Sequence, residues 1–253
     1  MKLELDKRKA SGYKNPSQIA RVLTEGWARD NVYCPNCGQA NLSAFENNRP
    51  VADFFCDVCR EQFELKSKRG RLGKKIVDGA YQTMLERVSA ANNPSFFFLT
   101  YTPAYQVKNF LIIPKHFFVP TVVEKRKALP PTARRAGWQG CNIVLSAVPE
   151  SGRIFYVRGG EVAPKRSVLA AWQKTVFLRR LTQKNRGWLL DVLACVERLP
   201  RTFELQEVYA FEAHLADLHP ENKHVRAKIR QQLQVLRDRG FISFKTRGHY
   251  EKL

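Results

Sequence analysis

The chain has 253 residues, 44% of them hydrophobic, which is enough for one large or two ordinary domains around a buried core. Its 43 lysines and arginines exceed its 23 aspartates and glutamates, giving a formal net charge of +20, and most of the excess precedes residue 184. This charge favours a polyanionic partner, nucleic acid before a membrane surface. No signal-peptide core and no membrane-length apolar run occur, so we expect a soluble cytoplasmic protein.

Residues 14–31 predict an amphipathic helix, because apolar residues recur at helical spacing from Ile19 to Trp27 and Pro16 suits a first helical turn. Glu25 lies on this helix. In many metal nucleases an acid on a helix ahead of the core sheet supports the active site. For Glu25 we prefer the simpler interpretation of a solvated surface glutamate.

Four cysteines follow in the pattern Cys-x2-Cys-x18-Cys-x2-Cys, formed by Cys34, Cys37, Cys56 and Cys59. In a reducing cytoplasm such closely spaced pairs are more often metal ligands than disulfides, and this spacing predicts a structural zinc site. Four thiolates complete a tetrahedral shell and leave no position for water, so we assign the zinc to folding. Cys141 and Cys195 have no such partners in sequence and are interpreted as buried core thiols.

Two carboxylates and a lysine surround the second cysteine pair within residues 47–68: Asp53, Glu64 and Lys66. On a strand Glu64 and Lys66 share one face, while Phe63 and Leu65 point into a core. An acid ending one strand and a Glu-x-Lys pair on its neighbour can hold Mg²⁺ beside a phosphodiester, with the ammonium orienting the attacking water. The pattern predicts a nuclease active site on a zinc-stapled hairpin.

The chain continues with a basic segment at 68–75, which is either a phosphate-contacting loop or a solvated one. A helix is predicted over 78–91 and another over 168–181. Short apolar runs bounded by Pro or Asn predict buried strands, and further strands follow; the expected strands are 95–101, 109–114, 141–145 and 153–157. This order predicts an α/β core with a mixed sheet.

Residues 125–140 form a predicted irregular loop that is rich in basic residues, proline and glycine. Arg134, Arg135 and Trp138 combine charge with a large flat ring, which suits phosphate anchoring and base stacking or wedging. A basic surface loop whose tryptophan packs on the core explains the same residues equally well.

The polar stretch 182–187 predicts a domain boundary, with a nuclease domain at 1–183 and a second domain at 184–253. The second domain contains predicted helices and an alternating tail that turns at Gly248 into a hairpin; the expected helices are 188–199, 205–218 and 222–239. Three helices closed by a hairpin predict a winged helix that binds duplex DNA with its third helix in the major groove.

The DNA-binding face expected of this domain lies on the third helix and on the hairpin. The helix residues are Arg226, Arg230, Gln231, Gln234 and Arg237. The hairpin residues are Arg247, His249 and Tyr250. A charged helix face is often merely solvated, but these arginines and glutamines precede a wing, which favours base readout.

Several segments, in this order, closely resemble the family of N6-methyladenine-dependent restriction endonucleases in the PD-(D/E)xK superfamily: CPNCG, FENNRPVADFFC, FELKSK, NNPSFFFLTYT, PTARRAGWQGCNI and KIRQQLQVLRD. The resemblance runs essentially end to end. It implies a PD-(D/E)xK nuclease domain with a four-cysteine zinc site and a C-terminal winged helix. It also implies cleavage of duplex DNA at GATC sites when the adenine carries an N6-methyl group, with unmethylated DNA spared.

Carried over residue by residue, the resemblance implies that Asp53, Glu64 and Lys66 are catalytic and that the Leu65 carbonyl is an extra Mg²⁺ ligand. The four cysteines match the zinc site. One departure is that proline does not directly precede the acid, because Pro50 lies three residues before Asp53.

Our principal hypothesis is a methylation-dependent restriction endonuclease that uses Mg²⁺, carries structural zinc and is a monomer in solution. Trp138 and the Gln231/Gln234 face are the candidates for methyl recognition. The alternative is a non-catalytic zinc-ribbon and winged-helix regulator, which does not need Glu64-x-Lys66 beside Asp53. A third interpretation, an RNA nuclease or repair enzyme, keeps the chemistry and changes the substrate.

Overall fold

The computed structural model describes residues 1–46, 52–90 and 93–253, so Pro50 and the start of the 47–68 stretch lie outside the described residues. The chain divides into two compact units. Unit 1 comprises Met1–Lys74, Glu86–Phe117 and Ser151–Val176, and unit 2 comprises Lys75–Leu85, Phe118–Glu150 and Phe177–Leu253. Within the described parts of the chain, no helix has the length and apolar character needed to cross a bilayer.

Unit 1 is built on a seven-stranded sheet in the order β1-β2-β3-β5-β6-β9-β10. Its strands are β1 Ser43–Ala44, β2 Phe54–Phe55, β3 Gln62–Arg69, β5 Ser95–Tyr101, β6 Val107–Ile113, β9 Ile154–Arg158 and β10 Glu161–Val162. β3 and β5 run parallel, whereas the other neighbouring pairs run antiparallel. The predicted α/β core with a mixed sheet is confirmed.

The central strand β5 is buried along its whole length, as its continuous apolar run predicted. Phe97 of β5 stacks on Phe63 of β3 and on Phe110 of β6, with ring centroids 4.9 Å apart in each pair. These rings join the strand that carries Glu64 to the middle of the core. Phe63 itself is fully buried, as expected from the alternation along β3.

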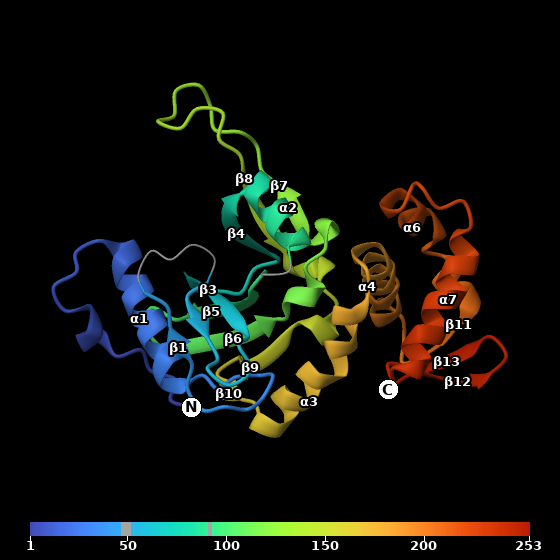
Figure 1. The fold of residues 1–253 in the computed structure, drawn as a ribbon, viewed down its shortest axis with the longest axis horizontal. Coiled ribbons are helices and arrows are strands. Elements are labelled where there is room, and N and C mark those ends of the chain that lie inside the picture. Colours follow the sequence, from blue (N-terminus) through green and yellow to red (C-terminus); the bar gives the residue numbers. More distant parts are fainter. Residues whose placement is uncertain (47–51, 91–92) are drawn as a thin grey trace. The chain divides into compact units, whose positions relative to one another are not determined.

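Two long helices pack on this core. α1 Pro16–Asn31 begins where the Asn15 side chain accepts hydrogen bonds from the first turn, and it brings Trp27 to the cluster. α3 Lys165–Thr175 contributes Trp172. Figure 1 shows α1 beside the seven-stranded sheet, and the predicted helix over 14–31 is confirmed.

Short 3-10 helices connect the larger elements: η1 Lys7–Ala10, η2 Lys115–Phe117, η3 Pro120–Val122, η4 Leu145–Ala147, η5 Glu150–Gly152 and η6 Val176–Arg180. The last of these replaces the end of the helix expected over 168–181. The α-helix therefore ends at Thr175 and the backbone tightens to a 3-10 turn beyond it.

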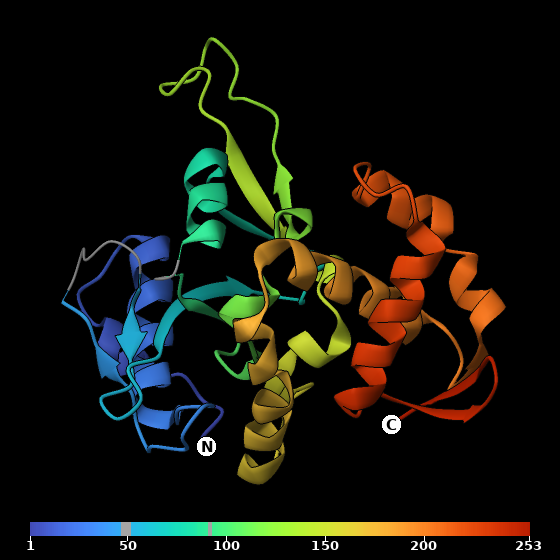
Figure 2. The ribbon, with the colours of Figure 1, turned by 45° about the vertical axis from the view of Figure 1, so that its right-hand side comes forward.

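Unit 2 contains a three-stranded antiparallel sheet in the order β4-β8-β7, formed by Lys75–Ala80, Gly140–Val144 and Val123–Lys125. The helix predicted over 78–91 begins later, as α2 Tyr81–Ser89, because residues 75–80 pair with β8 instead. The loop between β7 and β8 runs far out from both strands before it returns (Figure 2).

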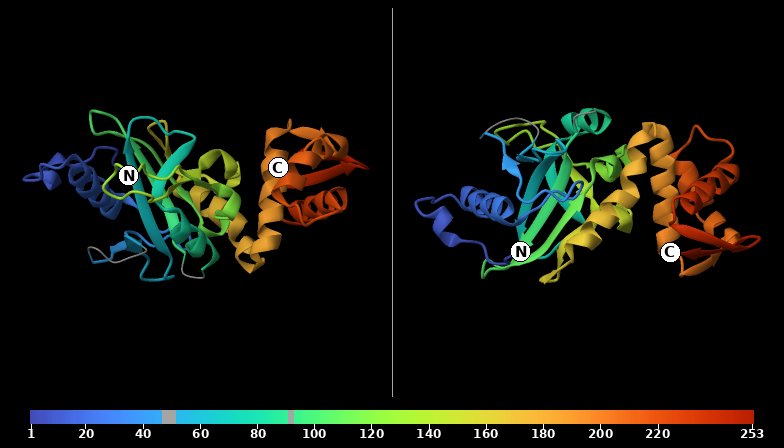
Figure 3. Two further views of the ribbon diagram at one scale, coloured as in Figure 1. Left: turned by 90° about the horizontal axis from the view of Figure 1, so that it is seen from above. Right: turned by 60° about the horizontal axis from the view of Figure 1, so that its bottom comes forward.

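The C-terminal part of unit 2 has the helices α4 Gln183–Arg198, α5 Leu205–Tyr209, α6 Glu212–Leu218 and α7 Val225–Asp238. A sheet in the order β11-β13-β12 accompanies them, made of Thr202–Glu204, His249–Lys252 and Ile242–Thr246 (Figure 3). The helix expected over 205–218 is broken at 210–211, and β11 adds a third strand to the expected hairpin. The predicted apolar stripe of α7 is buried: Val225, Ile229, Leu233 and Leu236.

Candidate functional site

The hairpin of β2 and β3 brings Asp53 against the Glu64–Leu65 peptide. The backbone N–H of Asp53 donates to the Phe63 carbonyl at 2.9 Å. The Leu65 N–H donates to Asp53 Oδ2 at 2.7 Å, which fixes the direction of the carboxylate. Asp53 lies just before β2 and not at the end of a strand, but the antiparallel pairing still delivers its carboxylate to β3.

Glu64 is contacted by two cations. The Lys66 Nζ lies 2.6 Å from Glu64 Oε1, as expected for residues two apart on one face of a strand. The Arg87 Nη1, from the last turn of α2, lies 3.3 Å from Glu64 Oε2. The Glu64 side chain is only 14% exposed, so both ion pairs lie in a partly dehydrated environment where they are stronger than on an open surface.

These residues line a cavity of about 360 Å³. The hairpin supplies Asp53, Glu64, Leu65 and Lys66, and the cavity is completed by Ser17, Ala20, Arg21, Thr24, Glu25 and Ser67. The structure therefore brings together all of the residues that the sequence assigned to catalysis and to Mg²⁺.

Glu25 belongs to this cavity, and the preferred interpretation of a solvated surface glutamate is wrong. Its side chain is 22% exposed and accepts a hydrogen bond from Arg21 Nε at 2.6 Å. Burial raises the pKa of the Glu25 carboxyl, an effect that the bond from Arg21 opposes and the nearby Asp53 reinforces. The Thr24 hydroxyl donates to the Ser67 hydroxyl at 3.2 Å and so ties α1 to β3. The place of Glu25 in the cavity follows from the packing of α1 on β3 and could not be deduced from the sequence.

The four predicted zinc ligands converge. Among the described residues, Cys34, Cys37, Cys56 and Cys59 form a group whose sulfur atoms all lie within 4.8 Å of one another. The Cys34–Cys59 and Cys37–Cys56 sulfur pairs are 3.4 and 3.5 Å apart, close to the separation of about 3.8 Å expected for thiolates around tetrahedral zinc. Burial raises the pKa of the Cys34 and Cys56 thiols. The cluster fits a structural zinc ion.

The first cysteine turn is bonded to α3. The Trp172 Nε1 donates to Asn36 Oδ1 at 2.9 Å, and the Gln173 side chain donates to the Asn36 carbonyl at 2.7 Å. Lys165 Nζ donates to the Gly38 carbonyl at 2.7 Å. The second cysteine turn continues into β3, because the Cys56 N–H donates to the Glu61 carbonyl at 2.9 Å. The cysteine cluster thus links a core helix to the strand that carries Glu64.

The candidate DNA-binding residues of the β7–β8 loop are partly engaged with one another. Arg134 and Arg135 are exposed. The Arg135 guanidinium lies 5.0 Å from the centre of the half-buried Trp138 ring, a cation–π contact that covers part of the ring. The Leu129 N–H donates to the Trp138 carbonyl at 2.9 Å, which closes the loop on itself.

The candidate residues of α7 form an exposed face of the helix: Arg226, Arg230, Gln231, Gln234 and Arg237. Arg226 pairs with Glu212 at 2.7 Å, and Arg230 donates to the Tyr209 hydroxyl at 3.2 Å. The Arg237 guanidinium lies 4.7 Å from the centre of the Phe244 ring on the hairpin. These contacts engage the three guanidinium groups with side chains of the same unit.

On the hairpin, Arg247 and His249 are exposed, whereas Tyr250 is 7% exposed. The Tyr250 ring stacks on Phe203 at 5.2 Å and meets the edge of Phe244 at 4.7 Å. Tyr250 therefore packs β13 to its neighbouring strands. Phe244, which the sequence did not single out, is the more exposed ring of this group.

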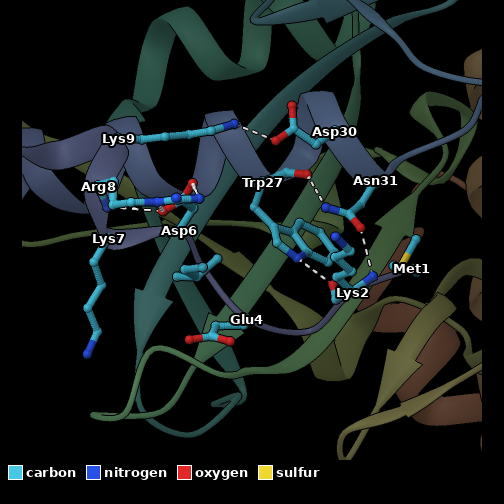
Figure 4. A pocket seen from close by; sticks show the side chains of 11 residues that line it. Met1, Lys2, Glu4, Asp6, Lys7, Arg8, Lys9, Trp27, Asp30 and Asn31 are labelled. Carbon is cyan, nitrogen blue, oxygen red and sulfur yellow. Dashed lines mark hydrogen bonds and ion pairs between the residues drawn. The ribbon is translucent and has the colours of Figure 1, made fainter.

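A larger hollow of about 780 Å³ lies at the N-terminal segment (Figure 4). Two ion pairs lie among its own residues: Arg8 with Asp6 at 2.9 Å, and Lys9 with Asp30. The Trp27 Nε1 donates to the Lys2 carbonyl at 2.7 Å. None of the residues that the sequence proposed for a site lines this hollow, and its contacts anchor the N-terminal segment to α1.

Residues 1–181 match the model of the DpnI family, described as the Dam-replacing family, and residues 184–252 match the Dam-replacing HTH (helix-turn-helix) domain. Three carboxylates and a lysine line one cavity in a chain that also carries an HTH domain, and together with the family match they define a DNA-binding protein of the restriction class. The first match alone covers more than half of the chain, so the chain belongs to the DpnI, or Dam-replacing, family.

Proposed function

We infer that the protein is a methylation-dependent restriction endonuclease, which hydrolyses duplex DNA at GATC sites carrying N6-methyladenine and requires Mg²⁺. The observation that carries this conclusion is the Asp53 carboxylate held against the Glu64–Leu65 peptide, in one cavity with Lys66. We assign the nuclease to residues 1–183 and a winged-helix DNA-binding domain to 184–253, in a monomeric cytoplasmic protein.

The donor set suits Mg²⁺, because the Asp53 and Glu64 carboxylates and the Leu65 carbonyl all offer hard oxygen ligands. Bound there, Mg²⁺ would neutralise charge on the scissile phosphate and lower the pKa of a water. The Asp53 carboxylate is oriented in advance by the Leu65 N–H at 2.7 Å. This orientation lowers the cost of organising the site when the substrate arrives.

Lys66 and Glu25 would act on the attacking water. The Lys66 ammonium, 2.6 Å from Glu64 Oε1, is close enough to the carboxylates to orient that water and to offset the charge that develops on the phosphate. Loss of Lys66 should cost cleavage on the order of 10²-fold. Glu25 lines the same cavity and can accept a hydrogen bond from the water.

Methyl recognition needs an apolar surface beside a hydrogen-bonding group, because N6-methylation removes one amino hydrogen and adds an apolar group in the major groove. Trp138 and the exposed Gln231 and Gln234 remain our candidates, with both domains reading the methylated site. If Trp138→Ala left the discrimination between methylated and unmethylated DNA unchanged, the role proposed for Trp138 would be wrong.

The test is incubation of the protein and Mg²⁺ with one plasmid prepared from methylating and from non-methylating hosts. We expect cleavage of the methylated plasmid alone, and we expect an Asp53→Ala protein to bind that plasmid without cutting it. Binding without cleavage by the unaltered protein would support a non-catalytic zinc-ribbon and winged-helix regulator instead. Cleavage of RNA or of damaged DNA in preference to the methylated plasmid would indicate an RNA nuclease or a repair enzyme with the same chemistry.

A further inference from the structure

We propose that Arg87 is a phosphate-binding residue that moves from Glu64 to the scissile phosphate when a divalent cation binds. The inference rests on the proposed function and adds a residue that neither the motif nor the sequence resemblance includes. Its starting point is the pairing of Glu64, whose Oε1 contacts Lys66 and whose Oε2 contacts Arg87.

A divalent cation bound to Glu64 competes with both of these contacts. A divalent cation that binds Glu64 needs at least one of its oxygens and brings two positive charges next to two existing ones. The Arg87 contact is the longer, at 3.3 Å against 2.6 Å for Lys66. Lys66 stands on β3, which pairs with β5 in the middle of the sheet, whereas Arg87 comes from the last turn of α2. Arg87 is therefore the cation that is displaced.

The charge balance of these residues favours a phosphate as the new partner of the displaced Arg87 guanidinium. The carboxylates of Asp53, Glu64 and Glu25 are matched by Arg21, Lys66 and Arg87, so the formal charge of these groups sums to zero without a metal. A divalent cation raises the sum to +2, and the backbone of a duplex supplies the compensating negative charge. Arg87 is 26% exposed and offers a planar fork of donors that matches phosphate oxygens.

Arg21 is the competing candidate for the same task. Its Nε lies 2.6 Å from Glu25 Oε1, a shorter contact than that of Arg87, and Glu25 is not among the proposed metal ligands. Metal binding therefore leaves the Arg21–Glu25 pair intact and breaks the Arg87–Glu64 pair. Because the two binding events share Arg87, metal affinity and DNA affinity should be coupled, each raising the other by the same factor.

The test compares Arg87→Ala and Arg87→Lys with Arg8→Ala, a control that also removes one arginine paired with a carboxylate, but whose partner is Asp6 and not a residue of the cavity. Calorimetric titration with Mn²⁺ in the absence of DNA should show about three- to tenfold tighter binding by Arg87→Ala, because a competing cation is gone. Binding of a methylated GATC duplex in Ca²⁺ should weaken about tenfold for this variant, with no change in EDTA. Arg87→Lys keeps the charge without the fork and should lie in between.

The salt dependence of DNA binding gives a second readout. In Ca²⁺, the slope of log affinity against log salt concentration should fall by about 0.9 for Arg87→Ala, the value for one phosphate contact. The inference is overturned if Arg87→Ala matches Arg8→Ala in Mn²⁺ affinity and in the Ca²⁺-dependent gain of DNA affinity. If Arg87→Ala does not fold, as judged by circular dichroism, the Arg87→Lys measurements decide in the same way. An unaltered protein that fails to cut methylated plasmid refutes the proposed function instead, so the two failures are distinguishable.

Discussion

Replacing Cys56 with serine tests whether a zinc ion holds in place the hairpin that carries Asp53 and Glu64. Cys56 is fully buried, and its sulfur lies 3.5 Å from that of Cys37. The strand that follows Asp53, β2, has only two residues in register with β3, Phe54 with Phe63 and Phe55 with Gln62. So short a strand contributes little stability by itself. We therefore expect the cysteine cluster to supply much of the stability of this hairpin.

The expected loss of folding stability follows from the loss of zinc affinity. If removing one of four thiolates weakens binding about 10³-fold, zinc stabilises the fold by about 4 kcal/mol less. For a chain of this size each kcal/mol shifts the melting temperature by about 2–4 °C, so we expect Cys56→Ser to melt about 8–16 °C lower. Cleavage of methylated plasmid should fall with it, since the position of Asp53 depends on the same turn.

Three measurements test the prediction for Cys56→Ser: zinc content of the purified protein, melting followed by circular dichroism, and plasmid cleavage. Cys195→Ala is the matched control, because Cys195 is also a buried thiol but lies outside the four-cysteine cluster. Burial raises the pKa of Cys195 to about 11, so it stays a protonated, inert thiol at neutral pH. The control should keep its zinc and its activity. A Cys56→Ser protein that keeps a full equivalent of zinc, or cuts at the unaltered rate, would refute the reasoning.

Three further predictions follow from the packing, the cavity and the exposed helix. Phe97→Ala should lower the free energy of unfolding by about 3–5 kcal/mol in urea titration, with Phe97→Leu much milder because leucine refills most of the cavity; equal losses would contradict this volume argument. Glu25→Gln should slow cleavage by about 10- to 100-fold with DNA binding kept, and an unchanged rate would remove Glu25 from the site. Arg230→Ala should lower the salt-dependence slope of DNA affinity by about 0.9, whereas an unchanged slope would mean that Arg230 contacts no phosphate.

The sequence by itself determined the features that depend on local spacing. The Cys-x2-Cys pairs predicted converging thiols because each short turn brings its own two sulfurs together, and the structure joins both pairs. The two-residue period of a strand gave Glu64 and Lys66 a common face, and the continuous apolar run at 95–101 predicted the buried β5. The buried stripe of α7 followed in the same way from helical periodicity.

The tertiary structure alone decided which distant segments meet at the cavity. Glu25 has the sequence pattern of a surface glutamate, and it lies at the site because α1 packs on β3. Arg87 reaches Glu64 from another helix, and β4 is a strand because residues far along the chain pair with it. Contacts of this kind depend on how the elements pack against one another, and the periodicity of one segment carries no information about its partner. For that reason the sequence identified the proposed metal ligands but not the charges that balance them.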